Sequence, residues 1–234
     1  MILQALITYS LQDFFRSHKY FPPISTYIIF IFVFYTYTPN PVIDSYAVTA
    51  VVLYIISSWL CISLLSLDPP VQKQVMILTI ESSTRYYLSK LVSVWLIAIA
   101  LTLYAFFYPI IFNMFSEPIS FTTGSVSLIN HILSATLGVC VASLFSSGLM
   151  KSLINSYGGL AFTLTLSIAA QGIYTVLPSP FKQIVWAIPP AMTTQSPLRN
   201  WSGETFIGLP LFPFVWLVIY SCLILLLFLK LSKR

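Results

Sequence analysis

The stretch Leu209–Leu229 contains 21 residues and not one Asp, Glu, Lys or Arg. At 1.5 Å per residue it would form a helix about 32 Å long. The hydrocarbon core of a bilayer is about 30 Å thick, so a helix of this length crosses it once. The sequence therefore predicts a membrane-spanning helix in this stretch.

The rest of the chain has the same apolar character. Hydrophobic residues make up 58% of the sequence and charged residues 7%, and the mean hydropathy is +0.90. Soluble domains carry about 25% charged residues, so a chain this poor in charge could not solvate its surface in water. In lipid, backbone groups must be satisfied internally, which leaves helices or closed barrels. The apolar runs are continuous rather than alternating, so we predict an all-α polytopic membrane protein.

Six apolar runs are candidates for membrane-spanning helices within a single domain, residues 1–234. We expect the spans at about 21–38, 45–67, 91–115, 128–150, 158–177 and 209–229. Residues 1–20 repeat apolar side chains near the helical period, which favours an interfacial helix over a soluble tail. In the long loop 178–208, the segment SPFKQIVWAIPP is expected to form a short helix. Its first residues, Ser-Pro, suit a helix cap and first turn, and its two final prolines end the helix.

Basic residues are unevenly divided between the two sides of this topology. Nine Lys and Arg lie on the side of the termini, and two, Lys182 and Arg199, lie on the other. The six acids split three and three, so the bias belongs to the basic residues. Basic residues gather in cytoplasmic segments, so we expect both termini in the cytoplasm. The net charge of +5 fits this rule and contact with a bilayer that carries anionic headgroups, not nucleic-acid binding.

Motifs that carry chemistry are missing from the sequence. It has no GxxxxGK[ST] phosphate loop, no HExxH and no GxSxG. Only two histidines are present, His18 and His131, which is too few for a two-haem membrane cytochrome with four imidazole ligands. None of the expected spans holds a pair of acidic residues, which disfavours a carboxylate protease or a proton-driven pump. We therefore expect no enzymatic activity, no cofactor and no metal in this chain.

Several expected spans contain hydroxyl or amide side chains, and these have two interpretations. The first is hydrogen bonding between helices, worth about 0.6–2 kcal/mol for each bond. The second is the lining of a substrate path through the membrane. The residues that the second interpretation selects are Ser57, Ser58, Thr163, Ser167 and Gln171.

The segment Leu67–Lys90, which joins the second and third spans, combines charge with an apolar centre. Its sequence is LDPPVQKQVMILTIESSTRYYLSK, and it holds five of the 17 charged residues of the chain. Asp68 is expected to cap a helix whose first turn contains Pro69 and Pro70. The topology places this helix on the cytoplasmic side.

This short helix is apolar on two sides. At 100° per residue, Val71, Val75 and Leu78 share one face, and Met76 and Ile77 belong to the opposite one. A helix outside the membrane core cannot bury both faces against the bilayer. One face is therefore expected to bind a groove on a protein partner.

The whole chain resembles the permease subunit of type-2 ABC exporters. The resemblance rests on six spans with cytoplasmic termini and on the segment between spans two and three. That segment matches the family pattern at Asp68, a short helix over Val71–Ile80, the pair Thr84-Arg85, and Lys90. It departs from the pattern where Asp-Pro-Pro replaces a frequent Glu-Arg pair, and where the proline often found before the Ser-Arg is absent.

The resemblance implies a dimer of permeases, either two copies or two related chains, with two cytoplasmic ATPase subunits that bind ATP and Mg. It also implies an exporter of an amphipathic or hydrophobic substrate, a peptide by analogy with bacterial bacteriocin and antimicrobial-peptide systems, in a bacterial plasma membrane. The short helix would then be a coupling helix seated on the ATPase. The residues that the resemblance assigns to coupling are Asp68, Val71, Lys73, Val75, Met76, Leu78, Glu81 and Arg85.

Two other function classes stay open at this stage. One is a structural or assembly subunit of a membrane complex that transports nothing. The other is an intramembrane enzyme that uses His131 with a nearby hydroxyl. An ATPase that responds to substrate separates the exporter from the first, and the activity of a His131→Ala variant tests the second.

Overall fold

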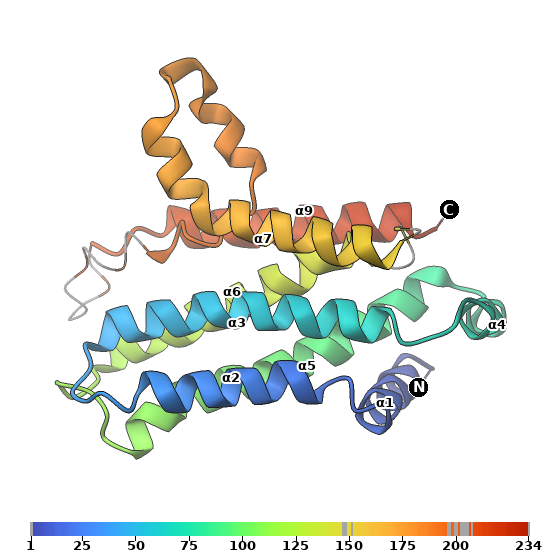
Figure 1. The fold of residues 1–234 in the computed structure, drawn as a ribbon, viewed down its shortest axis with the longest axis horizontal. Helices are drawn as coiled ribbons and strands as arrows, with labels where there is room; N and C mark the ends of the chain where they lie inside the picture. The colour runs from blue at the N-terminus through green and yellow to red at the C-terminus, as the bar shows by residue number, and fades with distance from the viewer. Residues whose placement is uncertain are drawn as a thin grey trace.

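The computed structural model describes residues 2–146, 149–150, 152–195, 198, 201, 206 and 208–233. Within these residues the chain is helical, and the one backbone bridge between extended segments joins Asn40 to Phe115. The helices run side by side along one long axis, apart from three short elements (Figure 1). In chain order the elements are α1 (Ile2–Arg16), α2 (Phe21–Phe34), α3 (Val42–Leu65), α4 (Pro70–Ile80), α5 (Ser83–Ile111), α6 (Phe121–Ser143), α7 (Leu153–Val176), the 3-10 helix η1 (Ser179–Ala187) and α9 (Phe212–Leu231).

Five of the described helices are long and apolar enough to cross a membrane: α3, α5, α6, α7 and α9. This confirms a helical, multi-pass membrane protein. The first expected span, 21–38, is shorter in the structure, because α2 ends at Phe34 and has 14 residues, about 21 Å. Pro39 follows, and a proline disfavours the helical conformation in the residue before it.

Two helices begin earlier than the apolar runs suggested. Helix α5 starts at Ser83 rather than near residue 91, because the Ser82 side chain accepts a hydrogen bond from the Arg85 backbone N–H at 3.3 Å. Helix α6 starts at Phe121 rather than near 128, where the Ser120 side chain accepts from the Thr123 N–H at 3.1 Å. The apolar runs identified the spans but missed the polar first turns, which are set by these caps.

Helices α3 and α6 form the interior of the molecule. In their most apolar windows, 72% of the α3 residues and 67% of the α6 residues are buried. The two helices approach closely at Gly138, where an added Cβ would overlap the Ser57 hydroxyl and the Tyr54 carbonyl oxygen. Small residues such as Gly138 thus allow α3 and α6 to pack closely. Helix α2 packs on the outside of α3 through Tyr27, whose hydroxyl donates to the Thr49 carbonyl at 3.2 Å.

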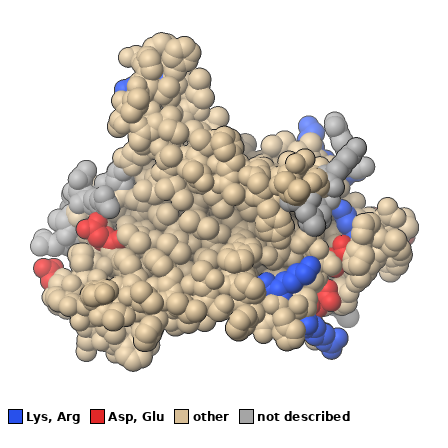
Figure 2. Space-filling view, viewed as in Figure 1, with Lys and Arg blue, Asp and Glu red and all other residues tan. Residues whose placement is uncertain are grey.

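The two ends of the bundle differ in charge. One end, here the terminus end, holds α1, α4 and the last turn of α9, and Figure 1 shows α1 and α4 there, nearly end-on to the viewer and so across the long axis. The opposite end, here the loop end, holds the connections α2–α3 and α5–α6 and the start of α9. Among the described residues, every Lys and Arg except Lys182 belongs to the terminus end, and Figure 2 shows blue side chains gathered there.

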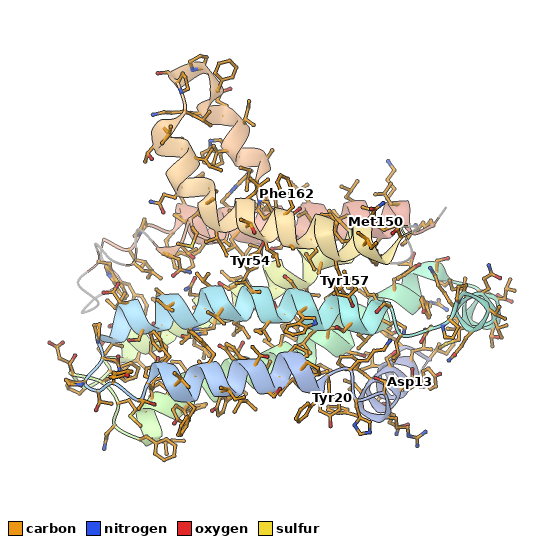
Figure 3. The ribbon with its side chains drawn as sticks, in the orientation of Figure 1. Asp13, Tyr20, Tyr54, Met150, Tyr157 and Phe162 are labelled. Carbon is orange, nitrogen blue, oxygen red and sulfur yellow. The ribbon has the colours of Figure 1, made fainter. Side chains whose placement is uncertain are left out.

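One pair of elements stands away from the bundle. Helix α7 bends, and its last turns together with η1 form a hairpin that projects sideways from the other helices (Figure 1). The helix expected in SPFKQIVWAIPP is this η1, although no side chain caps its first turn. Large side chains of α7 are exposed, among them Tyr157 and Phe162 (Figure 3). The described part of α7 is therefore mostly uncovered by the rest of the chain.

Candidate functional site at the terminus end

Helix α4 is a short helix with two unlike faces. It begins after Pro69, whose extended backbone leads into Pro70, and it ends at Glu81, which has a left-handed φ of 54°. Val71, Val75 and Leu78 are 72%, 57% and 75% exposed. These three apolar side chains, here called the α4 apolar face, point away from the rest of the described chain.

The opposite face of α4 rests on the protein. Met76 and Ile77 are partly buried and pack against the central apolar cluster. The Lys73 ammonium lies 5.1 Å from the centre of the Tyr87 ring on α5, so this cation is directed back toward the bundle. The division into two faces that the sequence pattern indicated is the one the structure has. No part of the described chain covers the α4 apolar face.

Asp68 does not cap α4, and that expectation was wrong. The residue before the helix is Pro69, and no side chain caps the first turn. Asp68 is instead buried, and its Oδ2 accepts from the Lys90 ammonium at 2.8 Å and from the Tyr86 hydroxyl. The two prolines leave few backbone N–H groups to cap, and Lys90 on α5 supplies a charge partner that a cap would not. The ion pair thus ties the start of α4 to α5.

Sequence reasoning missed the contribution of Tyr86 and Lys90. The sequence indicated Lys90 as part of the family pattern and did not assign Tyr86 to coupling, yet both are buried. The two residues are four apart, so they share one face of a helix. Tyr86 and Lys90 share a helix face only because α5 starts at Ser83. The apolar run that predicted this span begins at residue 91, so both residues were expected in a loop.

Helix α1 supports the same region. The Gln72 side-chain amide on α4 donates to the Tyr9 hydroxyl at 2.8 Å. On the bundle side, the Ser93 hydroxyl of α5 donates to the Ile7 carbonyl at 3.3 Å, and Phe14 is fully buried. Helices α1, α4 and α5 are therefore connected at the terminus end, while the remaining expected coupling residues, Glu81 and Arg85, are exposed beside the end of α4.

The expected substrate-path residues do not form one surface. Ser58 is buried between α3 and α6, and its hydroxyl lies 3.0 Å from the Gly138 carbonyl and 2.8 Å from the Tyr54 carbonyl. Ser57 is buried beside it and donates to the same Tyr54 carbonyl at 3.1 Å. Ser58 makes the helix-to-helix hydrogen bond of the first interpretation, whereas the Ser57 hydrogen bond stays within α3. Their part in a path stays a prediction.

The other three path residues lie on α7. Thr163 bonds the Gly159 carbonyl of its own helix at 2.9 Å, and Ser167 donates to the Pro189 carbonyl at 2.6 Å, which fastens the segment after η1 to α7. Gln171 is exposed and lines a cavity between α7, η1 and α9. Sequence analysis gave no sign of this cavity, because its walls come from segments far apart in the chain.

His131 occupies a structural position. It is fully buried in α6. Its Nε2 lies 2.9 Å from the Thr49 hydroxyl on α3, and its Nδ1 lies 2.8 Å from the Ser127 carbonyl. Both ring nitrogens therefore have partners: the Thr49 contact joins α6 to α3, and the Ser127 contact stays within α6. Across the described chain, no three His, Cys, Asp or Glu side chains are grouped closely enough to hold a metal ion.

Comparisons of the chain with protein families, with curated proteins and with solved structures found no match.

Proposed function

We propose that the chain is the permease subunit of a type-2 ABC exporter, and that ATP is hydrolysed on a separate subunit. The observation that carries the proposal is the α4 apolar face. Three large apolar side chains lie exposed on a short helix at the end of the bundle that carries the basic residues. Isolated exposed apolar residues are ordinary, but three on one face of a helix outside the spans are typical of a binding surface.

The charges at the two ends support the orientation. Basic residues gather in cytoplasmic segments, which supports a cytoplasmic position for the terminus end, with both termini and α4, at a bacterial plasma membrane. A cytoplasmic ATPase can reach α4 only there. The sequence has no GxxxxGK[ST] of its own, so ATP and Mg would be held by this partner, two copies of which serve a pair of permeases.

The buried ion pair supports a mechanical role for α4. Movement of the ATPase surface would be passed through α4 to the Asp68–Lys90 pair and so to α5. Helix α1 would lie in the cytoplasmic interface and follow the same movement through the Gln72 contact with Tyr9. In this proposal α2 also crosses the membrane and brings the number of spans to six. Because α2 is short, the bilayer would thin around it or its flanking residues would extend to the interface.

A second permease chain would pack on α7. The exposed side of α7 carries small residues at helical spacing: Gly158, Ala161, Thr165, Ala169 and Gly172. Small residues allow membrane helices to approach closely. The substrate would be an amphipathic or hydrophobic peptide, which suits a chain with 14 Tyr, 18 Phe and very few charges. Thr163, Ser167 and Gln171 lie on this same helix, near such a dimer contact.

Affinity purification of the full chain from its own cells tests the proposal. We expect an ATPase that contains GxxxxGK[ST] to copurify in equal amount with the permease. ATP hydrolysis by the reconstituted complex should rise when the exported peptide is present. A complex that contains no ATPase, or one whose hydrolysis never responds to any candidate substrate, would instead favour the structural or assembly subunit.

A further inference from the structure

The cavity between the end of α7, η1 and the start of α9 has apolar walls and a volume of about 330 Å³. This volume lies within the range of about 300–1,000 Å³ that is usual for ligand pockets. Four aromatic side chains line it, Tyr174, Trp186, Phe212 and Trp216. Its polar contributions come from Gln171 and Thr193. Trp186 packs edge-to-face on Trp216 with ring centres 5.2 Å apart, so the aromatic wall is preformed.

The cavity lies at a definite depth in the bilayer. Phe212, Pro213 and Trp216 line it, and they belong to the first five residues of α9, within about 6 Å of the loop end of that span. This depth corresponds to the boundary between headgroups and acyl chains, where Trp and Tyr are enriched. Tyr174 and Trp186 are 45% and 47% exposed, so the cavity is reached from outside the bundle.

A cation stands at the rim of the cavity. The Lys182 ammonium lies 4.9 Å from the centre of the Tyr174 ring. In the part of the chain that the structure describes, Lys182 is the one Lys or Arg outside the terminus end. The Tyr220 hydroxyl donates to the Ala187 carbonyl at 2.7 Å, which holds η1 against α9 and so fixes the cavity beside this cation.

We propose that this cavity binds one anionic phospholipid from the leaflet at the loop end, with an acyl chain among the aromatic side chains and the phosphate at Lys182. One cation beside an apolar cavity matches one anionic headgroup attached to an apolar chain. A peptide segment of a second copy fits less well, because its backbone N–H and C=O groups would be buried against walls with few polar partners. The proposal is independent of the exporter function.

Photolabelling of the full-length protein in vesicles tests the site. The vesicles are made of phosphatidylcholine, with either phosphatidylglycerol or phosphatidylcholine carrying a diazirine on the acyl chain. Mass spectrometry measures adducts on the peptides that contain Trp186 and Trp216, relative to adducts around Leu223 and Leu226, which are exposed on α9 away from the cavity. We expect the phosphatidylglycerol probe to label the cavity peptides more strongly than the phosphatidylcholine probe.

Two variants and their controls decide the outcome. Lys182→Gln should lower cavity labelling by phosphatidylglycerol about fivefold, and Lys182→Arg should restore it. Ala170→Phe fills the cavity and should abolish labelling by both probes. Val176→Phe adds bulk on the same helix at a side chain that is 85% exposed and outside the cavity lining, and it should change nothing.

Three results would overturn the proposal. The first is equal labelling of the cavity by both lipids in the unaltered protein. The second is unchanged phosphatidylglycerol labelling in Lys182→Gln, a variant at the rim that does not depend on how Ala170→Phe folds. The third is labelling of a second protein chain by a photoreactive group placed at Trp186, which would assign the cavity to a second copy.

Discussion

Helices α3 and α9 are similarly apolar but have opposite surroundings. Their most apolar windows have mean hydropathies of 2.2 and 2.6, yet 72% of the window is buried in α3 and 22% in α9. The interior helices α3 and α6 meet through glycine, serine and histidine contacts, whereas the peripheral helices α7 and α9 expose most of their length. Hydropathy identifies which segments can cross a membrane, but small and polar side chains decide which of them pack together.

The largest expected effect belongs to the buried ion pair between Asp68 and Lys90. Lys90→Met would leave the Asp68 carboxylate buried without its cation, which costs about 3–5 kcal/mol. The double variant Asp68→Asn with Lys90→Met should recover much of this loss, because no charge is then buried alone. The measurement is the temperature at which the detergent-solubilised protein loses its monodisperse peak. Lys230→Met, at an exposed position on α9, is the matched control and should leave that temperature unchanged. A double variant no more stable than Lys90→Met would contradict the pairing.

Substitution of a glycine should have opposite effects on stability in the interior helix α6 and in the peripheral helix α7, and this difference is smaller than the effect of breaking the ion pair. Gly138→Ala forces a methyl group against Ser57 and the α3 backbone, and we expect a loss of about 1–3 kcal/mol. Gly172→Ala, on α7, meets no atom within 4 Å and should gain up to about 1 kcal/mol from helix propensity. Thermal unfolding of the two variants side by side measures the difference. Equal destabilisation would show that α3 and α6 do not meet at Gly138.

His131 tests whether the interior polar contacts are structural. His131→Ala removes the contact with Thr49 and should destabilise the protein by about 1–2 kcal/mol. At a temperature where the variant is folded, transport and substrate-stimulated ATP hydrolysis should match the unaltered complex. Loss of activity in a fully folded variant would support the intramembrane enzyme instead.

The smallest effect on stability is expected on the periphery. Thr165→Leu changes an exposed position on α7, so the stability of the single chain should shift by no more than about 0.5 kcal/mol. Disulfide cross-linking between cysteines introduced at Ala161 of two chains should fall, because a larger side chain separates the paired helices. Cross-linking that is unaffected by Thr165→Leu would place the second permease elsewhere.

The sequence was sufficient to predict most of the architecture. Long uncharged runs such as Leu209–Leu229 predict membrane helices because the length of a span is set by the bilayer. The two faces of α4 followed from helical periodicity alone, since Val71, Val75 and Leu78 are exposed while Met76 and Ile77 pack inward. Both predictions depend only on the spacing of residues that are close together in the sequence.

Contacts between distant segments could not be predicted in this way. An acidic residue before two prolines is typical of a helix N-terminus, so the local sequence favoured a capping role for Asp68. Its partner is instead Lys90, which lies 22 residues away in the sequence. The cavity at Trp186 and Trp216 likewise needs the bend of α7 and the return of η1 to α9. The contact of Ser57 and Ser58 with Gly138 of α6 also joins residues about 80 positions apart in the sequence.

The central claim is that the α4 apolar face binds an ATPase, and the double variant Val75→Asp with Leu78→Asp tests it most directly. Both side chains are exposed in the chain itself, so expression and unfolding temperature should be unchanged. Because two carboxylates would be buried without partners in the ATPase groove, capture of the ATPase should fall about tenfold or more, and stimulated ATP hydrolysis should be lost. Gln74→Asp, exposed at the edge of the same face, should keep most of the capture. Normal ATPase capture by the double variant would contradict the claim.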